Sequence, residues 1–457
     1  MKAGILSPIF SLPVPGGRGD FSVVKDYLNF LHRSGLSYWQ ILPINPVDAY
    51  GSPYASFSLS AGDLGLLDLT ALAEDGLLAR ADVVAAEEKE DYLFEYLDFE
   101  RAAREPGYAV FLQEEGTWAK DAAVFRALRR QYGVLMNWPD RYRIYDVNTV
   151  APLWNESAVQ KYAVLEYLFD RQWYALRNHA RGLGITIVGD LPYYPGRDSL
   201  ELWRMPENFL LDENRNPLYI SGVPGDDFND AGQTWNSPVY DWERLRADDF
   251  RFHTALFRRA LKRYDLVRLD HFRGYEKIFH IPYGETPKEG HWAPVPGREL
   301  LSRFLSMRDR FLIEDLGTLD RAFYEFRDAF GFRGMGVLPF EAPGTISAYP
   351  RIYYTGNHDT APLGGYVSEM GAFERRGWED YLKKPISREN LLQYALERPE
   401  EIVIFQHTDL WDDAPRINVP GTETGNWRAQ IPARYMDEKT AEYIRQRIGE
   451  RADNNGY

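Results

Sequence analysis

Eight short apolar segments recur along the chain and are separated by stretches with helical periodicity. Most of them end in a polar residue or a proline, and an alternation of this kind indicates parallel β/α units. They are AGILS from Ala3, YWQILP from Tyr38, ITIVGD from Ile185, LVRLD from Leu266, FLIED from Phe311, GVLPF from Gly336, RIYYT from Arg351 and IVIFQ from Ile402. Eight such strands predict an α/β fold of the closed (β/α)8 TIM-barrel type.

Helices fit between these strands. In residues 20–35 the apolar side chains form one helical stripe, with Asp20 as a predicted N-cap and Gly35 as the stop. Similar stripes occupy residues 157–184 and 250–264 and end just before the third and fourth strands. The charged tail after Pro432 also has a helical pattern and is expected to be peripheral.

Two segments are too long for simple connections within the barrel. Residues 45–155 contain helical patterns of their own, which predicts an inserted, mostly helical subdomain beside the barrel mouth. Residues 191–242 are rich in Pro, Gly, Asn and aromatic residues, and a loop region of that length is expected to contact substrate. Residues 1–457 are otherwise expected to form a single catalytic barrel.

Composition narrows the classes of function. Because the chain has no cysteine, it has no disulfide, thiolate nucleophile or thiolate metal site. A net charge of −15 argues against nucleic acid or an anionic membrane as partner and favours a neutral substrate. No apolar run is long enough to span a membrane, and the N-terminus lacks a secretory pattern, so a cytoplasmic location is expected. The 15% of aromatic residues suits sugar stacking, although an aromatic-rich core is an equal alternative.

Three acids stand where strands of the barrel end. Asp270 closes LVRLD, Glu314 follows FLI, and Asp359 follows RIYYTGNH. The C-terminal ends of barrel strands carry the catalytic residues of this fold, whereas a lone acid there is more often a cap or an ion-pair partner. Three acids together favour catalysis.

The neighbours of these acids predict divided roles. Arg268 shares a strand face with Asp270 and should keep it ionised, which suits a nucleophile. Glu314 emerges from an apolar run, where burial and an anionic neighbour raise a carboxyl pKa, which suits a general acid. Retaining glycosidases need such a pair of carboxyl groups. His358 and Asp359, and also His271, could bind hydroxyls of the reacting sugar, although a simple capped turn is the alternative for the TGNHDT segment.

Other chemistries lack their motifs. The histidines show no metal-binding spacing, and no phosphate-binding glycine loop, dinucleotide fingerprint or G-x-S-x-G elbow is present. We therefore expect neither a metal nor a cofactor.

Seven motifs in order along almost the whole chain resemble the 4-α-glucanotransferases, the amylomaltases or disproportionating enzymes of the α-amylase clan. They are YGSPYASFS from Tyr50, GDLPYY from Gly189, GQTWNSPVYDW from Gly232, VRLDHFRG from Val267, IEDLG from Ile313, TGNHD from Thr355 and RINVPGTETGNW from Arg416. The resemblance implies transfer of α-1,4-glucan segments between maltooligosaccharides by a retaining double displacement. It leaves the oligomeric state open.

The resemblance also implies roles for individual residues. Asp270 would be the nucleophile, Glu314 the acid/base and Asp359 the acid that stabilises the transition state. The sugar donor would be bound by Tyr54, Asp190, Arg268, His271, His358 and Asn418, and Gln233 and Trp235 would lie on a loop over the acceptor. Core packing is the alternative for Tyr54 and Trp235, and a turn cap is the alternative for Asp190.

The chain departs from the family pattern at three places and is somewhat shorter than typical members. The family usually has W-G-N-P where this chain has Trp235, Asn236, Ser237 and Pro238, and H-D-N-D-T where it has H-D-T-A from His358. After Gln406 an aspartate is usual, and here His407 stands. These positions bear on donor length, acceptor choice and the balance of transfer against hydrolysis. A hydrolase using the same acids, a transferase acting on a modified sugar and a catalytically silent glucan-binding protein are the alternatives.

Overall fold

The computed structural model describes residues 2–14, 17–225, 230–422 and 424–454, with side chains to residue 449. Its centre is an eight-stranded parallel sheet in the order β10-β11-β12-β1-β2-β3-β6-β9. The strands are β1 (Lys2–Leu6), β2 (Tyr38–Gln40), β3 (Thr186–Leu191), β6 (Leu266–Leu269), β9 (Phe311–Ile313), β10 (Gly334–Val337), β11 (Arg351–Tyr354) and β12 (Ile402–Gln406).

The two outer strands of this order meet and close the barrel. A parallel bridge joins Leu312 to Arg333, and the amide of Ile313 donates to the carbonyl of Arg333 at 2.8 Å. The predicted (β/α)8 barrel is therefore confirmed, and all eight predicted segments contribute a strand. The segment from Gly336 differs in extent: β10 begins at Gly334, and Leu338–Phe340 form a 3-10 turn. Pro339 has no amide hydrogen with which to continue the ladder.

Alternation along the strands decides which side chains enter the barrel. Leu266, Val188 and Leu312 belong to a buried cluster that receives side chains from all eight strands, whereas Val267 and Ile313 pack into the surrounding core. Because side chains two apart share a face, the residues that follow this inward register point toward the mouth. Those residues include Asp190, Arg268, Asp270 and Glu314.

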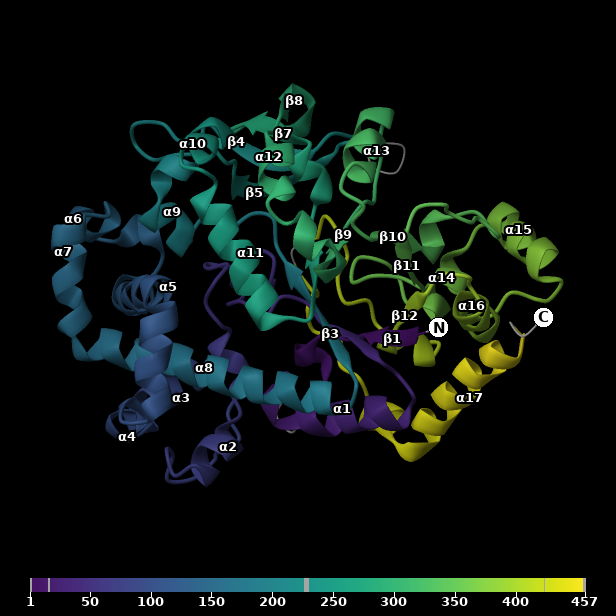
Figure 1. Ribbon diagram of the computed structural model, residues 1–457, viewed down its shortest axis with the longest axis horizontal. Coiled ribbons are helices and arrows are strands. Elements are labelled where there is room, and N and C mark those ends of the chain that lie inside the picture. The colour runs from purple at the N-terminus through teal and green to yellow at the C-terminus, as the bar shows by residue number, and fades with distance from the viewer. Residues whose placement is uncertain (1, 15–16, 226–229, 423, 455–457) are drawn as a thin grey trace.

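Helices surround the barrel, as Figure 1 shows. Asp20 accepts the amide of Ser22 and caps the short turn before α1 (Val24–Arg33), as its predicted capping role requires. The two predicted helices before the third and fourth strands are α8 (Ser157–Gly182) and α11 (Arg251–Arg263). The later helices are α12 (Gly297–Ser302), α13 (Arg321–Asp328), α14 (Leu363–Glu369), α15 (Ala372–Leu382), α16 (Arg388–Leu396) and α17 (Glu438–Asn454).

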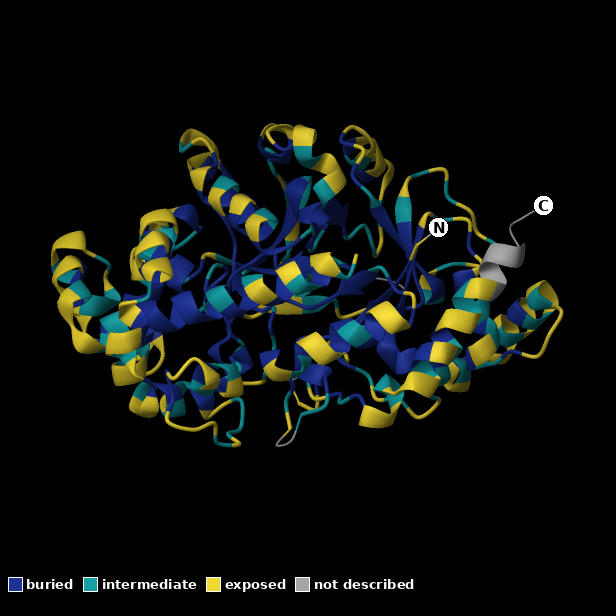
Figure 2. Cartoon of the chain, turned by 60° about the horizontal axis from the view of Figure 1, so that its bottom comes forward, coloured by how far each residue is buried: buried dark blue, intermediate teal, exposed yellow. Residues whose placement is uncertain are grey.

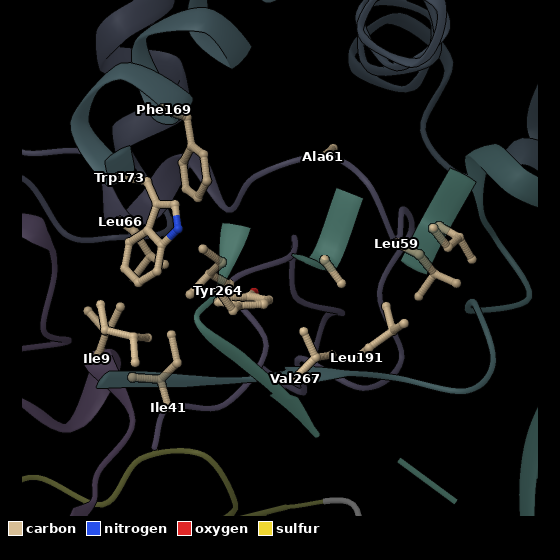
Figure 3. Close-up of a cluster of buried hydrophobic side chains, with 14 of the residues drawn as sticks. Ile9, Ile41, Leu59, Ala61, Leu66, Phe169, Trp173, Leu191, Tyr264 and Val267 are labelled. Carbon is tan, nitrogen blue, oxygen red and sulfur yellow. The ribbon is translucent and has the colours of Figure 1, made fainter. Parts of the chain in front are cut away.

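The core of the molecule lies between the outer surface of the barrel and these helices. Figure 3 shows part of it, where Phe169 and Trp173 of α8 lie on one side of Tyr264 and Val267 lies beside Leu191 on the other. The indole nitrogen of Trp173 donates to the carbonyl of Arg263 at 3.0 Å, so this buried polar group is satisfied. Figure 2 shows the result: the strands are buried, and the outer faces of the helices are exposed.

The segment 45–155 contains helices that gather on one side of the barrel, at the left of Figure 1. They are α2 (Leu69–Glu74), α3 (Lys89–Tyr96), α4 (Phe99–Ala103), α5 (Pro106–Tyr132), α6 (Asp140–Arg143) and α7 (Val147–Val150). The long helix α5 packs against α8, and a buried ion pair between Arg126 and Glu166 joins the two at 2.8 Å.

A second sheet, which the sequence analysis did not predict, lies above the barrel in Figure 1. Its four antiparallel strands are ordered β5-β4-β7-β8. They are β4 (Tyr219–Val223), β5 (Gln233–Pro238), β7 (Lys277–Pro282) and β8 (His291–Pro294), and α9 (Leu200–Arg204) and α10 (Trp242–Ala247) flank the first two. Within the predicted loop region 191–242, residues 226–229 lie outside the described part of the chain, as does Glu423 of the last motif.

No helix within the described ranges is both long and apolar enough to cross a membrane.

Candidate active site

A buried arginine holds two carboxylates at the end of β6. Nη1 of Arg268 donates to both oxygens of Asp190 at 2.8 Å and to Oδ1 of Asp270 at 2.7 Å. The side chains of Arg268 and Asp190 are buried, whereas that of Asp270 is 24% exposed. Asp190 lies within β3, so it is not the turn cap that the sequence analysis considered. The arrangement presents the ion-paired carboxyl group of Asp270 to the mouth, while the guanidinium group that binds it is buried.

Glu314 lies beside this group because the chain after β6 turns back toward it. His271 has a left-handed backbone, with φ of 45°, and its amide donates to Oε2 of Glu314 at 2.8 Å. A non-glycine residue in this conformation carries a cost that the surroundings must offset, and such residues cluster at functional sites. The residue directly after Asp270 therefore holds the carboxylate of Glu314.

The environment of Glu314 raises its pKa to about 8. Burial is the main cause, the negative charge of Asp270 adds to it, and the guanidinium of Arg268 opposes both. Burial also lowers the pKa of His271 to about 4, so its imidazole is neutral at pH 7. Near neutral pH the site thus contains an Asp270 carboxylate in an ion pair and a Glu314 that carries a proton, the division that a nucleophile and a general acid require.

Asp359 lies in the turn after β11, and in the closed barrel only β10 stands between this strand and β9, which leads to Glu314. Nδ2 of Asn418 donates to its Oδ1 at 2.6 Å, and Nε2 of His358 lies 3.4 Å from its Oδ2. Asn357, not Asp359, accepts the turn amide, so the capped-turn alternative does not account for the Asp359 side chain. Its side chain is 40% exposed, which leaves it free to meet a ligand.

Tyr54 connects these two parts of the site. Its hydroxyl donates to Oδ2 of Asp190 at 2.7 Å and lies 3.3 Å from Nδ1 of His358. Its ring stacks on the imidazole ring of His358, with the two centroids 4.8 Å apart. The ring of Trp427 lies 5.8 Å from that of Tyr54 and 5.9 Å from that of His358. Trp427 ends the last of the seven sequence motifs, and no role was predicted for it. Tyr54 is partly buried and packs against the apolar cluster inside the barrel, so both packing and these polar contacts hold its ring.

Trp235 reaches the site from the second sheet. Its ring lies edge-on to that of His271 with centroids 4.7 Å apart, and its indole nitrogen donates to the side chain of Gln233 at 3.3 Å. Trp235 is 37% exposed, which does not fit the core-packing alternative. The next residue, Asn236, has φ of 57°, where the family pattern has glycine. Asparagine tolerates this conformation better than other side chains do, so the turn survives the replacement.

His407, the third departure from the pattern, lies away from these contacts. It is buried, and its two ring nitrogens bond the hydroxyl of Tyr27 at 2.8 Å and the carbonyl of Tyr435 at 3.0 Å. Burial lowers its pKa to about 4. This histidine ties α1 and the C-terminal region to the end of β12 and contacts none of the candidate site residues described above.

Within the part of the chain that the structure describes, no cluster of three or more His, Asp or Glu side chains is arranged to hold a metal ion.

Known proteins of one family match this chain over almost its whole length. A family model described as 4-alpha-glucanotransferase matches residues 7–435. The chain is 34% identical to the 4-alpha-glucanotransferase of Aquifex aeolicus (strain VF5), with 98% of each chain covered. It is also 34% identical to that of Thermus thermophilus, with 93% of each covered.

Solved structures show the same relationship. The chain superposes on the amylomaltase from Streptococcus agalactiae in complex with acarbose with a TM-score of 0.88 and 28% identity, covering 99% of each chain. The amylomaltase from Corynebacterium glutamicum, at 18% identity and a TM-score of 0.77, shares the fold over 98% of this chain and 75% of its own. From the family model and these relatives together, we conclude that the chain belongs to the 4-alpha-glucanotransferase family.

Proposed function

We propose that this chain carries out its 4-alpha-glucanotransferase reaction by a retaining double displacement in which Asp270 is the nucleophile and Glu314 the acid/base. Asp270 attacks the anomeric carbon of an α-1,4-linked glucan, and Glu314 gives its proton to the departing glycosidic oxygen. A covalent glucanyl-enzyme forms. The 4-hydroxyl of an acceptor glucan then attacks, Glu314 takes its proton, and the two inversions restore the α configuration.

One observation carries this proposal. Asp270 is ion-paired with Arg268, and the amide of the next residue, His271, holds Glu314. The two carboxyl groups are thereby tied to one short segment of chain, where Asp270 is ion-paired and the raised pKa of Glu314 favours its protonated form. This is what a nucleophile and a proton donor acting on one bond need.

The remaining candidate residues suit the binding of sugars on either side of that bond. We assign Asp359, His358 and Asn418, with Tyr54, Asp190, Arg268 and His271, to the donor. A hydrogen-bonded pair such as Asp359 and Asn418 can form stronger hydrogen bonds to the sugar hydroxyls as the ring of the reacting sugar flattens, which would stabilise the transition state. Gln233 and Trp235 are assigned to the acceptor side, because Trp235 reaches His271 from the second sheet and its indole nitrogen donates to the side chain of Gln233.

The donor and acceptor that we propose are maltooligosaccharides. The amylomaltase of Streptococcus agalactiae was solved with acarbose, and its fold covers this whole chain. We further propose that the insertion 45–155 and the region 191–242 form the walls of the site and exclude water. Transfer exceeds hydrolysis only when an acceptor sugar occupies the place that water would take.

Incubation of the enzyme with maltotriose as the only substrate tests whether it transfers glucan segments. Transfer is expected to yield glucose together with maltotetraose and longer oligosaccharides. Chromatography of the products measures their amounts and shows whether the number of glycosidic bonds is conserved. Glucose and maltose without longer products would instead indicate the hydrolase alternative. No reaction with maltotriose, but transfer from an amino- or otherwise modified oligosaccharide, would favour the modified-sugar alternative, and binding without any product would favour a silent glucan-binding protein.

The pH dependence follows from the protonation state of Glu314. The acid must carry its proton to release the leaving group, and its pKa is raised to about 8. Activity measured as kcat/KM should therefore be retained up to about pH 7 and fall as the pH rises through about 8. A basic limb below about pH 6 would contradict the assignment, since it would mean that Glu314 titrates like an ordinary exposed carboxyl group.

A further inference from the structure

The barrel has one weak seam, between β9 and β10. These strands are the two ends of the sheet order. Within the described residues the backbone link recorded between their edges is the bridge of Leu312 with Arg333, to which the amide of Ile313 contributes its bond. Glu314 follows β9 directly. On the β6 side the backbone of Glu314 is fixed, because its amide donates to the carbonyl of Leu269 at 3.1 Å and its carbonyl accepts the amide of Phe272 at 3.2 Å. On the β10 side its position depends on whatever else joins the two strands.

Asp315 supplies that connection with its side chain. Its carboxylate accepts the amide of Met335 in β10 at 2.7 Å and Nη1 of Arg327 in α13 at 3.0 Å, and the side chain is 5% exposed. Arg327 in turn lies over the ring of Tyr349, 3.6 Å from its centroid. A Cβ at Gly334 would lie 2.5 Å from Oδ2 of Asp315, so only glycine permits this close approach.

We propose that Asp315 is a positioning residue, which ties β9 to β10 across the seam and thereby controls the proton transfer performed by Glu314. The inference rests on the proposed role of Glu314 as the acid/base. Asp315 would not touch the sugar. Its effect would come from two sources: it fixes the position of Glu314, and its own negative charge lies beside Glu314.

The charged surroundings of Glu314 support the second effect. Arg268 and Asp270 face it from β6 and the residue that follows, the amide of His271 donates to it, and Asp315 adjoins it on its own segment. The charges of Asp270 and Asp315 raise the pKa of Glu314, and Arg268 lowers it. Burial raises the pKa of Asp315 itself to about 6, against the contacts from Met335 and Arg327. Asp315 is therefore ionised in the range where Glu314 titrates.

Two substitutions at this seam should move the basic limb of kcat/KM for maltotriose in opposite directions. Asp315→Asn keeps an oxygen that can accept the amide of Met335 but removes the charge, so the limb should move to lower pH by about 0.5 to 1 unit. Arg327→Gln leaves the charge of Asp315 without its counter-ion, so the limb should move to higher pH. Asp328→Asn is the matched control. Asp328 pairs with the same arginine at 2.9 Å but is 56% exposed, and its loss should leave the limb in place.

The pH at which kcat/KM falls in the two variants tests the inference. Opposite shifts support the inference, whereas reduced kcat in both variants with an unmoved limb would overturn it and leave Asp315 a purely structural residue. If Asp315→Asn fails to fold, as its thermal midpoint would show, the shift in Arg327→Gln alone decides between the two. Glu314→Gln separates this inference from the function it rests on: if that variant keeps the basic limb of the parent enzyme, the acid/base assignment itself is wrong.

Discussion

With Asp270 replaced by asparagine, kcat for the disproportionation of maltotriose is expected to fall by about 10⁴-fold or more, because an amide oxygen is too weak a nucleophile to form the covalent intermediate. The fold should survive. Arg268 keeps its bonds to both oxygens of Asp190 when the contact with Asp270 is lost, so its buried charge is still compensated. Glucose release measured at saturating maltotriose gives the ratio of the two rates.

Two further measurements make this result specific to the nucleophile. The thermal midpoint of Asp270→Asn should stay near that of the parent enzyme, which separates lost chemistry from lost structure. The affinity for maltotriose, followed by tryptophan fluorescence, should change far less than the rate, because the groups assigned to sugar binding remain. A variant that retained a tenth of the parent activity would show that another residue forms the covalent bond.

The inward register of the strands explains why the sequence predicted so much of this site. Asp190, Arg268 and Glu314 each stand two residues beyond a side chain that fills the barrel, so strand alternation alone sends them to the mouth. The ion pair of Arg268 with Asp270 was predictable on the same ground and is present at 2.7 Å. Local periodicity was sufficient here because neighbouring parallel strands place their ends together.

Contacts between distant segments were not accessible in this way. The hydrogen bond from His271 to Glu314 depends on a left-handed residue that no propensity predicts for histidine in this place. The ring of Trp427 comes within 5.8 Å of Tyr54 although the two residues stand at opposite ends of the chain. The hydrogen bond from Met335 to Asp315 exists because β9 and β10 form the seam, and a pattern of eight strands does not say which two neighbours share the fewest backbone bonds.

The second sheet was missed for a different reason. Strands β4 and β5 contain glycine, proline, serine and asparagine, residues that disfavour strands, and β5 carries the left-handed Asn236 beside a shift of register. These strands form because β7 pairs with β4, β4 pairs with β5, and Ile220, Phe279 and Ile281 form a small buried apolar cluster. Tertiary pairing thus overrides weak local preference, and it brings Trp235 to His271.

Glu314→Gln is expected to lower kcat for maltotriose by about 10² to 10⁴-fold, because the glutamine amide has no proton to give to the leaving oxygen. The substitution keeps a side-chain oxygen for the amide of His271, so the geometry of the site should be retained. Asp270 remains intact. The variant should therefore still react with a donor whose leaving group needs no proton, such as α-maltosyl fluoride.

This donor separates the two carboxylates. In Glu314→Gln, fluoride release should proceed as a burst, and a maltosyl adduct should accumulate because no base remains to activate the acceptor hydroxyl in the second step. Mass spectrometry of the digested adduct should place it on Asp270, and azide, an anion that needs no deprotonation, should release it as maltosyl azide. Asp270→Asn should show neither burst nor adduct. If the substitution Glu314→Gln lowered the rates with maltotriose and with α-maltosyl fluoride by the same factor, Glu314 would not be the proton donor. The raised pKa that burial gives Glu314 would then have no part in protonating the leaving group.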